Sequence, residues 1–387
     1  MADRARPRLL LVTRNLPPAI GGMERLNRHM ALELARGFDV AVVGPRGCAA
    51  FLEPSMCVRE VAAKPLVRFF AAALIQSAAL ARRLRPKVVL AGSGLTAPFA
   101  WLAARVAGAR CVVYVHGLDL IADYALYRWF WRPFIRRADL CVANSRHTAG
   151  LAEQIGVPGA RIAIVHPGVD LPIDVAAGDF RRRFELGEGP LLLSVGRLIA
   201  RKGLLEFVEH ALPRIAAEFP EVRLVVIGNE NPDLLHGDSS GLGARIRERA
   251  ASLGLADVVR FLGPQDDATL AHAYVAANVH VFPVREVPGD VEGFGMVAVE
   301  AAAHGLPSVA FAVGGVPDAV AEGRSGHLAA PGDYARFAEC VNALLRRRGD
   351  ASLRASAREF AADFRWERFG ERLRAALAPH GAQSGAP

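Results

Sequence analysis

Short apolar segments alternate with longer amphipathic segments along almost the whole chain of 387 residues, and no other feature restricts the fold as strongly. The apolar segments are continuous and lack a polar residue at every second position. Such runs are typical of strands that are buried on both faces of a parallel sheet. Strands that alternate with helices build βαβ units, so the sequence predicts an α/β fold with two doubly wound domains.

The expected elements fall into two series. The first series has strands at Leu9–Thr13, Val40–Val43, Val88–Ala91, Cys111–Val115 and Leu140–Ala143, and helices at Met23–Arg36, Ala97–Val106, Tyr124–Arg136 and Ser145–Ile155. The second series has strands at Leu191–Val195, Leu224–Ile227, Val258–Leu262, Val279–Phe282 and Val309–Phe311, and helices at Leu204–Ala217, Gly243–Leu253, Asp267–Ala276 and Met296–His304.

A segment rich in Pro and Gly, from His166 to Pro190, separates the two series, as is typical of a linker. Two doubly wound domains that face each other form a cleft at the carboxyl ends of their strands, where ligands bind in such folds. We expect one domain over residues 1–172, a linker over 173–189, a second domain over 190–362, an amphipathic helix packing back across the domains over 363–378, and a disordered tail over 379–387.

Composition argues against a membrane-spanning or disulfide-linked protein. The longest apolar run, Phe69–Ala81, is shorter than the roughly 18 residues that a spanning helix needs. The N-terminal run Leu9–Val12 is too short for a signal peptide. The five cysteines lack CxxC spacing, so neither a disulfide framework nor a structural zinc is expected. We therefore expect a cytoplasmic protein.

Only the first part of the chain, residues 1–170, carries a net positive charge. Residues 1–170 carry 23 Lys and Arg against 11 Asp and Glu, a net charge of +12, whereas the remainder carries 24 against 28, a net charge of −4. A basic half favours an anionic partner: nucleic acid, a phosphorylated substrate or an anionic lipid surface. The alternative is charge spread over a solvated surface. Patterns of a nucleic-acid groove or recognition helix are missing, so nucleic acid is not expected.

The segment from Val291 to Val320 has the most specific pattern. A predicted strand ends at Phe282, and a helix begins just after Gly293-Phe294-Gly295. Glycines allow close approach of a ligand, and the N–H groups of a first helical turn favour a phosphate. Glu292 and Glu300 flank this turn, and a carboxylate can accept two hydrogen bonds from a sugar diol.

A second segment, Leu191–Gly203, joins a predicted strand to Gly196 and to two cations, Arg197 and Lys202. A guanidinium and an ammonium at the end of a buried strand suit a diphosphate. The alternative is a pair of solvated surface cations.

In the first half, Gly21-Gly22 opens a helix and could bring backbone amides near a phosphate or a sugar, although the pair is not a GxGxxG fingerprint. The strand Cys111–Val115 ends in His116, with Asp119 three residues later. A single histidine is often structural, but its place at a strand end before a glycine makes a role in the site an equal alternative.

Taken together, these segments resemble the retaining GT-B glycosyltransferases of family four over nearly the whole chain. Glu292 and Glu300 match the E-x7-E motif of that family. Four further segments occur in the expected order: the Gly21-Gly22 loop, Ala143–Thr148, His166–Asp170 and Ser194–Gly203. The resemblance implies two Rossmann-like domains, of which the N-terminal one holds the acceptor and the C-terminal one the nucleotide-sugar donor.

The resemblance also implies a role for each site residue. Arg197 and Lys202 would neutralise the donor diphosphate in place of a metal ion, and no DxD sequence or other cofactor signal is present. Glu300 would hold the ribose, Glu292 the transferred sugar, and His116 would lie beside the sugar and the acceptor. The other donor contacts would come from Gly21, Gly22, Leu262, Gly263, Phe294, Gly295, Met296 and Val297.

The sequence DVEGFG (290–295), which precedes Glu300, resembles that of phosphatidylinositol mannosyltransferases and related bacterial mannosyltransferases. We therefore expect a hexosyltransferase that moves mannose from GDP-mannose to a lipid-linked or saccharide acceptor in cell-envelope glycan synthesis. The alternatives are a UDP-sugar donor carrying glucose, galactose or N-acetylglucosamine, a GT-B sugar-nucleotide epimerase, and a binding scaffold without activity.

Two basic, apolar stretches in the first half suit an anionic membrane surface. Lys64–Lys87 is an expected helix with cations at both ends, and Tyr124–Arg137 mixes aromatic residues with four arginines. Aromatic and Arg side chains together are typical of membrane interfaces. Peripheral docking on the inner face of the plasma membrane and a core helix with a basic solvent face are equal alternatives.

Overall fold

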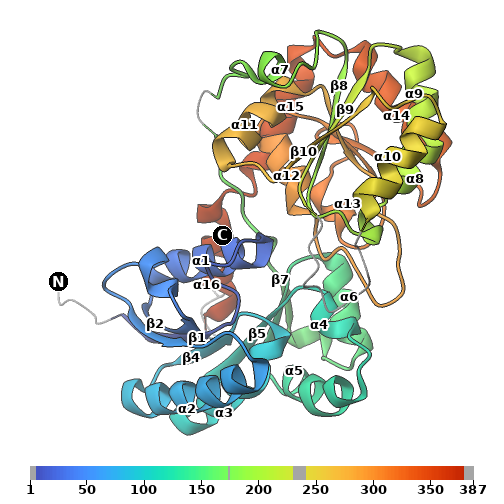
Figure 1. The fold of residues 1–387 in the computed structure, drawn as a ribbon. Helices are drawn as coiled ribbons and strands as arrows, with labels where there is room; N and C mark the ends of the chain where they lie inside the picture. Colours follow the sequence, from blue (N-terminus) through green and yellow to red (C-terminus); the bar gives the residue numbers. More distant parts are fainter. Residues whose placement is uncertain (1–5, 173–174, 230–240, 379–387) are drawn as a thin grey trace, which may run out of the picture. The chain divides into compact units, whose positions relative to one another are not determined.

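Two parallel β-sheets form the centres of the two units into which the chain divides (Figure 1). The structure, a computed structural model, describes residues 6–172, 175–229 and 241–378. Unit 1 comprises Met1–Gly168 and Trp366–Pro387, and unit 2 comprises Val169–Arg365. The expected tail, 379–387, lies outside the described residues.

Within the described part of unit 1, a seven-stranded parallel sheet has the order β3-β2-β1-β4-β5-β6-β7. The strands are β1 Arg8–Val12, β2 Asp39–Pro45, β3 Cys57–Val61, β4 Val88–Ala91, β5 Arg110–Val115, β6 Leu140–Ala143 and β7 Ile162–Ile164. The helices are α1 Gly22–Ala35, α2 Leu66–Leu84, α3 Ala97–Ala107, α4 Leu118–Ile121, α5 Arg132–Arg136, α6 Arg146–Gln154 and α16 Trp366–Leu377, with short turns at η1 Cys48–Phe51, η2 Gly94–Thr96, η3 Tyr127–Trp131 and η4 Gly159–Arg161.

The sheet described in unit 2 is also parallel, with the order β10-β9-β8-β11-β12-β13. Its strands are β8 Leu191–Val195, β9 Arg223–Ile227, β10 Val259–Gly263, β11 Val279–Phe282, β12 Ser308–Phe311 and β13 Gly326–Ala329. The helices and turns are α7 Phe180–Arg183, η5 Ala200–Lys202, α8 Leu204–His210, α9 Leu212–Glu218, α10 Leu242–Ser252, α11 Asp267–Ala276, α12 Met296–Ala303, α13 Val316–Ala319, α14 Tyr334–Arg346 and α15 Ala351–Ala362.

Both faces of the unit 2 sheet are buried, which explains its continuous apolar strands. Along β9, Leu224 and Val226 belong to one hydrophobic cluster, whereas Val225 and Ile227 belong to the cluster on the other face. Successive side chains of a strand point to opposite faces, so both faces of β9 require apolar residues. Strand β1 lies inside the unit 1 sheet, and strand β8 lies inside the unit 2 sheet. Because each sheet is parallel, the carboxyl ends of its central strands lie at one edge.

Three strands were not anticipated. The edge strands β3 and β7 are partly exposed; Arg59 and Glu60 interrupt the apolar residues of β3, and β7 has only three residues. The third, β13, begins at Gly326, a residue that is unfavourable inside strands. The helix expected over 204–217 is divided into α8 and α9, since Pro213 lies in the first turn of α9 and cannot continue a helix.

The described part of the expected linker, 175–189, belongs to unit 2. The side chains of Phe180 and Leu186 are buried in a hydrophobic cluster of that unit, because they interrupt the Gly- and Pro-rich sequence with apolar surface. The chain enters unit 2 at Val169, whose N–H donates to the carbonyl of Phe364 at 2.7 Å.

The last described helix, α16, belongs to unit 1 and lies beside α1 (Figure 1). The ring of Trp366 stacks on His29 at 3.9 Å between centroids. Arg374 donates to the backbone carbonyl of Glu33 and approaches its carboxylate. No helix among the described residues is long and apolar enough to cross a bilayer.

Candidate functional site

The first turn of α12 follows a loop that only glycine can complete. Gly295 has a φ of 101°, and a Cβ there would lie 3.0 Å from the ring of Phe282. The ring of Phe294 is buried toward Phe364, so this residue can offer a ligand only its backbone. Met296 and Val297 open the helix and are half-buried. The first N–H groups of an α-helix have no partner within the helix and favour an anion.

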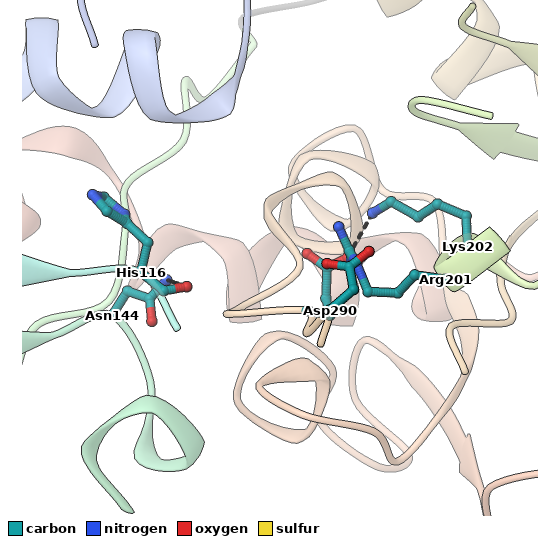
Figure 2. A network of polar contacts seen from close by, with 6 residues as sticks. His116, Asn144, Arg201, Lys202 and Asp290 are labelled. Atoms are coloured by element: carbon teal, nitrogen blue, oxygen red, sulfur yellow. Dashed lines mark hydrogen bonds and ion pairs between the residues drawn. The ribbon is translucent and has the colours of Figure 1, made fainter. Parts of the chain in front are cut away.

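A network of four charged side chains lies in the same unit as this helix. The Nζ of Lys202 donates to Oε2 of Glu292 at 2.7 Å, and the guanidinium of Arg201 donates to the same oxygen. On its other side, Nε of Arg201 lies 3.0 Å from Oδ1 of Asp290. In Figure 2, the side chains of Arg201 and Lys202 point toward Asp290. The four side chains are mostly buried, so the pairs are shielded from water.

Burial and charge act against each other in this network. Burial raises the pKa of Glu292, but the fields of Lys202 and Arg201 prevail and lower it to about 2. Burial lowers the pKa of Lys202, and the attraction of Glu292 offsets this only in part. The guanidinium of Arg201 loses hydration on burial, yet its two carboxylate partners raise its pKa. At neutral pH, Glu292 is therefore ionised and held by two cations.

Lys202 rests on a neutral aromatic surface. Its Nζ lies 4.7 Å from the ring centre of Phe282, which stacks on His280. Burial and the nearby Lys202 lower the pKa of His280 to about 3, so its ring is neutral at physiological pH. One nitrogen of that ring, Nδ1, lies 2.9 Å from the hydroxyl of Ser308. A cation above a ring face is attracted by the ring quadrupole, which helps to hold Lys202 in place.

Glycines also shape the loop that carries Lys202. Gly203 has a φ of 65°, and a Cβ there would lie 2.0 Å from the carbonyl oxygen of Pro283. Arg197, at the start of the loop, is exposed and lies close enough to Lys202 to lower the pKa of that amine. A small pocket at this point is lined by Gly196, Arg197, Lys202 and Phe282 among others. An anion in it would meet both predicted cations.

Glu300 lies on α12 and is contacted by a buried tyrosine. The hydroxyl of Tyr274 donates to Oε2 of Glu300 at 3.3 Å. The ring of His304 stacks on Tyr274, and its Nδ1 lies 2.8 Å from the carbonyl of Glu300. Tyr274 is 1% exposed, so its hydroxyl has a fixed position from which it orients the Glu300 carboxylate.

Leu262 and Gly263 end strand β10 at the same edge of the sheet. Gly263 has a φ of 68°, and its carbonyl accepts from the N–H of Gly228. The carbonyl of Leu262 accepts from the side chain of Gln265 at 2.6 Å. The two residues thus form a fixed, half-buried turn.

His116 lies at the carboxyl end of β5 in unit 1 and is 9% exposed. Its Nε2 lies 2.9 Å from the carbonyl of Gly92; since a carbonyl only accepts, Nε2 carries a proton in this contact, and in the corresponding tautomer Nδ1 is the acceptor. Asp119 accepts from the N–H groups of His116 and Gly94 and thereby fixes the turn. Asn144, also drawn in Figure 2, approaches the carbonyl of His116 at 3.5 Å.

Gly21 is the N-cap of α1 and Gly22 is its first residue, and both are exposed. Gly21 is in an extended conformation, and a Cβ there would lie 2.3 Å from the carboxylate of Glu24. That carboxylate accepts from Asn15 at 2.9 Å. The Gly pair therefore lies next to a short polar loop at the carboxyl end of β1.

The structure brings the predicted unit 2 residues to one edge of the sheet, at the ends of β8, β10 and β11 and at the start of α12. His116, Gly21 and Gly22 belong to unit 1 and lie at the corresponding edge of its own sheet. Sequence reasoning overlooked Arg201, Asp290 and Tyr274. Two of them could have been found from their neighbours in the sequence: Arg201 precedes Lys202, and Asp290 lies two residues before Glu292. The sequence holds no such signal for Tyr274. Among the described residues, no three or more acidic, His or Cys side chains form a group suited to a metal ion.

Comparison with known proteins places both units in one family. Residues 20–172 match the model for Glycosyltransferase Family 4, and residues 189–347 match that for Glycosyl transferases group 1. The D-inositol 3-phosphate glycosyltransferase of Mycobacterium marinum is 30% identical over 383 residues, which cover 90% of this chain and 78% of that protein. The same-named protein of Geodermatophilus obscurus is 39% identical over 254 residues, 62% of this chain and 53% of that protein, so the chain spans about half of its length.

A third relative aligns over nearly its whole length. The GDP-mannose-dependent alpha-(1-6)-phosphatidylinositol monomannoside mannosyltransferase of Mycolicibacterium smegmatis is 29% identical over 384 residues, 94% of this chain and 97% of that protein. The crystal structure of Anabaena HepE in complex with UDP has a TM-score of 0.78 at 20% identity and covers 96% of this chain and 99% of its own. The chain therefore belongs to the family 4, group 1 glycosyltransferases and has their GT-B fold of two Rossmann-like α/β domains.

Proposed function

We propose that the protein is a retaining hexosyltransferase that moves mannose from GDP-mannose to a lipid-linked or saccharide acceptor in cell-envelope glycan synthesis. The network of Lys202, Arg201 and Glu292 beside the first turn of α12 carries the proposal, because it joins buried cations to a carboxylate that can bind a sugar. The mannosyltransferase that aligns over 97% of its own length favours GDP-mannose.

The chemistry follows from where charge develops. As the bond between the sugar carbon and the diphosphate oxygen breaks, the leaving diphosphate gains negative charge. Fixed cations and amide dipoles stabilise such charge without reorganising during the step, and Arg197, Lys202 and the first turn of α12 supply them without a metal ion. The acceptor oxygen attacks the same face of the sugar, and the departing phosphate takes the acceptor proton, so the configuration is retained.

The other residues hold the donor. Glu300, oriented by Tyr274, accepts from the ribose diol, and Glu292 accepts from the hydroxyls of the transferred sugar. The turn at Leu262 and Gly263 contacts the base. His116 would use Nδ1, its acceptor nitrogen, toward the sugar or the acceptor.

Purified protein in a thermal-shift panel of GDP- and UDP-sugars tests the donor, since a ligand that binds the folded state raises the apparent stability. We expect GDP-mannose to give the largest shift and to yield product only when an acceptor is added. A larger shift with UDP-glucose, UDP-galactose or UDP-N-acetylglucosamine would indicate that this UDP-sugar is the donor instead of GDP-mannose. Product from the donor alone would indicate an epimerase, and binding without any product would indicate a scaffold.

The acceptor side of the proposal is an exposed surface of unit 1. Val67 and Ile75 of α2 are 76% and 63% exposed, and Leu126 and Trp129 in or next to η3 are 70% and 78% exposed. The two elements are neighbours, since the rings of Phe70 and Trp131 lie 5.3 Å apart. We name the four exposed apolar residues and the cations of 64–87 and 124–137 the basic apolar face.

We propose that the basic apolar face docks on an anionic lipid surface, the inner face of the plasma membrane. The two stretches contain ten Lys and Arg and no Asp or Glu. Exposed apolar side chains enter the interfacial region of a bilayer, and nearby cations pair with anionic headgroups. Each Lys or Arg near the surface contributes about 1 kcal/mol to the binding free energy. Docking would bring the N-terminal domain to a lipid-linked acceptor.

Liposome sedimentation tests this surface. We expect binding to phosphatidylcholine vesicles that contain anionic lipid, little binding to pure phosphatidylcholine, and a loss of binding in the double variant Leu126→Ser, Trp129→Ser. Phe51→Ser is the matched control, since Phe51 is 41% exposed and lies in neither stretch. Equal sedimentation of the double variant and the control would overturn the docking proposal and leave the transferase proposal intact.

A further inference from the structure

The ammonium of Lys202, a predicted partner of the donor diphosphate, is already neutralised by a carboxylate of its own chain. Its Nζ lies 2.7 Å from Oε2 of Glu292, and the two side chains are 17% and 13% exposed. A diphosphate that reaches Lys202 therefore competes with Glu292 for the same charge. The competition has a cost, because a buried carboxylate that loses its cation keeps the full desolvation penalty.

Arg201 removes that cost. Its guanidinium also donates to Oε2 of Glu292, and its side chain is only 7% exposed. If Lys202 turns to a diphosphate, Glu292 still has a buried cation beside it. A planar guanidinium with five donors suits this task better than a second ammonium, since it can bond two carboxylates at once from a fixed position.

Asp290 holds Arg201 from the opposite side. Its Oδ1 lies 3.0 Å from Nε of Arg201, and a turn closed by the bond from the N–H of Asp290 to the carbonyl of Val287 fixes its backbone. The Arg201 side chain thus lies between two carboxylates that belong to one loop. It cannot follow Lys202 toward a ligand without leaving Asp290.

We propose that Arg201 is a positioning residue that takes over the Glu292 carboxylate when Lys202 binds the donor diphosphate, and that Asp290 keeps Arg201 in place for this exchange. The inference rests on the proposed function, because it assigns Lys202 to the diphosphate. It adds distinct roles for two adjacent cations: Lys202 exchanges Glu292 for the diphosphate, whereas Arg201 stays paired with Glu292.

The experiment measures binding of GDP, UDP and inorganic pyrophosphate by calorimetry in four chains: wild type, Arg201→Met, Glu292→Gln and the double variant. In Arg201→Met, Glu292 has only Lys202 as a close cation and retains it, so we expect binding about tenfold weaker than wild type. In Glu292→Gln, Lys202 has no competitor, so we expect binding at least as tight as wild type. In the double variant, we expect the affinity to return to that of Glu292→Gln.

This rescue separates positioning from a merely structural role. If Arg201 only supports the fold of the loop, removing the charge of Glu292 cannot restore binding, and the double variant binds as weakly as Arg201→Met. Arg201→Lys covers the case in which Arg201→Met fails to fold. A lysine can pair with one carboxylate but not with both, so we expect an affinity between those of wild type and Arg201→Met.

Arg285→Met is the matched control. Arg285 is a neighbouring arginine whose N–H donates to the carbonyl of Arg201, but its side chain pairs with Glu206 instead of the network. We expect it to bind diphosphate as wild type does.

The outcomes also separate this inference from the proposed function. Binding of Arg201→Met within about twofold of wild type, or a double variant that is not rescued, would overturn the positioning role while sugar transfer by wild type stands. If the double variant shows the rescue but wild type transfers no sugar, the proposed function alone is overturned. Wild type that binds no diphosphate would overturn both.

Discussion

Replacing Lys202 by Met removes one charge from the proposed diphosphate site with little change in volume. A unit charge about 4 Å from a phosphate oxygen contributes roughly 4 kcal/mol at an effective dielectric constant of about 20, which suits a side chain that is mostly buried. Removal of one preorganised donor from a developing anion typically lowers kcat by about 10²–10³, or about 3–4 kcal/mol. The two estimates agree, so we expect kcat of Lys202→Met to fall by roughly two to three orders of magnitude.

The assay measures initial rates over a range of donor concentrations with a saturating acceptor. The loss should fall mainly on kcat, because the charge of the leaving group is greatest in the transition state. The fold should persist, because Glu292 keeps Arg201 as a partner. Arg346→Met, which removes an exposed cation paired with Glu218 on the same unit, serves as the control. A folded Lys202→Met enzyme with kcat within about threefold of wild type would refute the diphosphate site.

Four further predictions follow from the same structure. Tyr274→Phe removes the hydrogen bond to Glu300, worth about 1 kcal/mol, so steady-state kinetics should show the donor KM rising about fivefold with kcat nearly unchanged; a fall in kcat alone would contradict this role. The pKa of Glu292, about 2 in the folded chain against an ordinary 4.5, stabilises the fold by about 3 kcal/mol above pH 4.5, and this contribution is lost as the pH falls toward 2. Urea unfolding of Glu292→Gln should therefore differ from wild type at pH 7 and converge with it at low pH, whereas a constant gap would exclude the linkage. Trp366→Ala should lower the unfolding free energy by about 3–5 kcal/mol, measured by calorimetry, because it removes a buried ring that stacks on His29; a loss under about 1 kcal/mol would mean that α16 docks without it. Transfer should continue at the same rate after EDTA treatment, since protein cations face the diphosphate, and inactivation reversed by a divalent cation would contradict this.

The central strands could be predicted because their burial on both faces leaves a continuous apolar run in the sequence. Strand β1 was expected at Leu9–Thr13 and occurs at Arg8–Val12, and β11 was expected and occurs at Val279–Phe282. The edge strand β3 was missed because its exposed residues are charged, and a polar edge strand resembles a loop in a single sequence. The edge strand β7 was missed because its three residues form too short a segment.

The candidate site divides in the same way. Gly295 and Glu292 lie within one short motif, so their local arrangement could be inferred from spacing alone. The contact of Arg201 with Asp290 joins residues 89 positions apart and depends on how two loops fold at the sheet edge, which no local pattern reports. Tyr274 reaches Glu300 from a different helix for the same reason. Spacing therefore predicts the residues of one local motif, such as Glu292 and Gly295, more readily than the residues that contact them from other loops and helices.

The placement of α16 in unit 1 has a consequence for how the chain matures during synthesis. Unit 2 has all of its residues once Arg365 has left the ribosome, whereas unit 1, although it is begun first, lacks α16 until the residues that follow Arg365 have also been made. Until then, the surface of α1 around His29 and Glu33 has no Trp366 or Arg374 to cover it. A fragment that stops at residue 172 would lack α16 and leave that surface exposed. A single C-terminal truncation therefore cannot yield the complete unit 1.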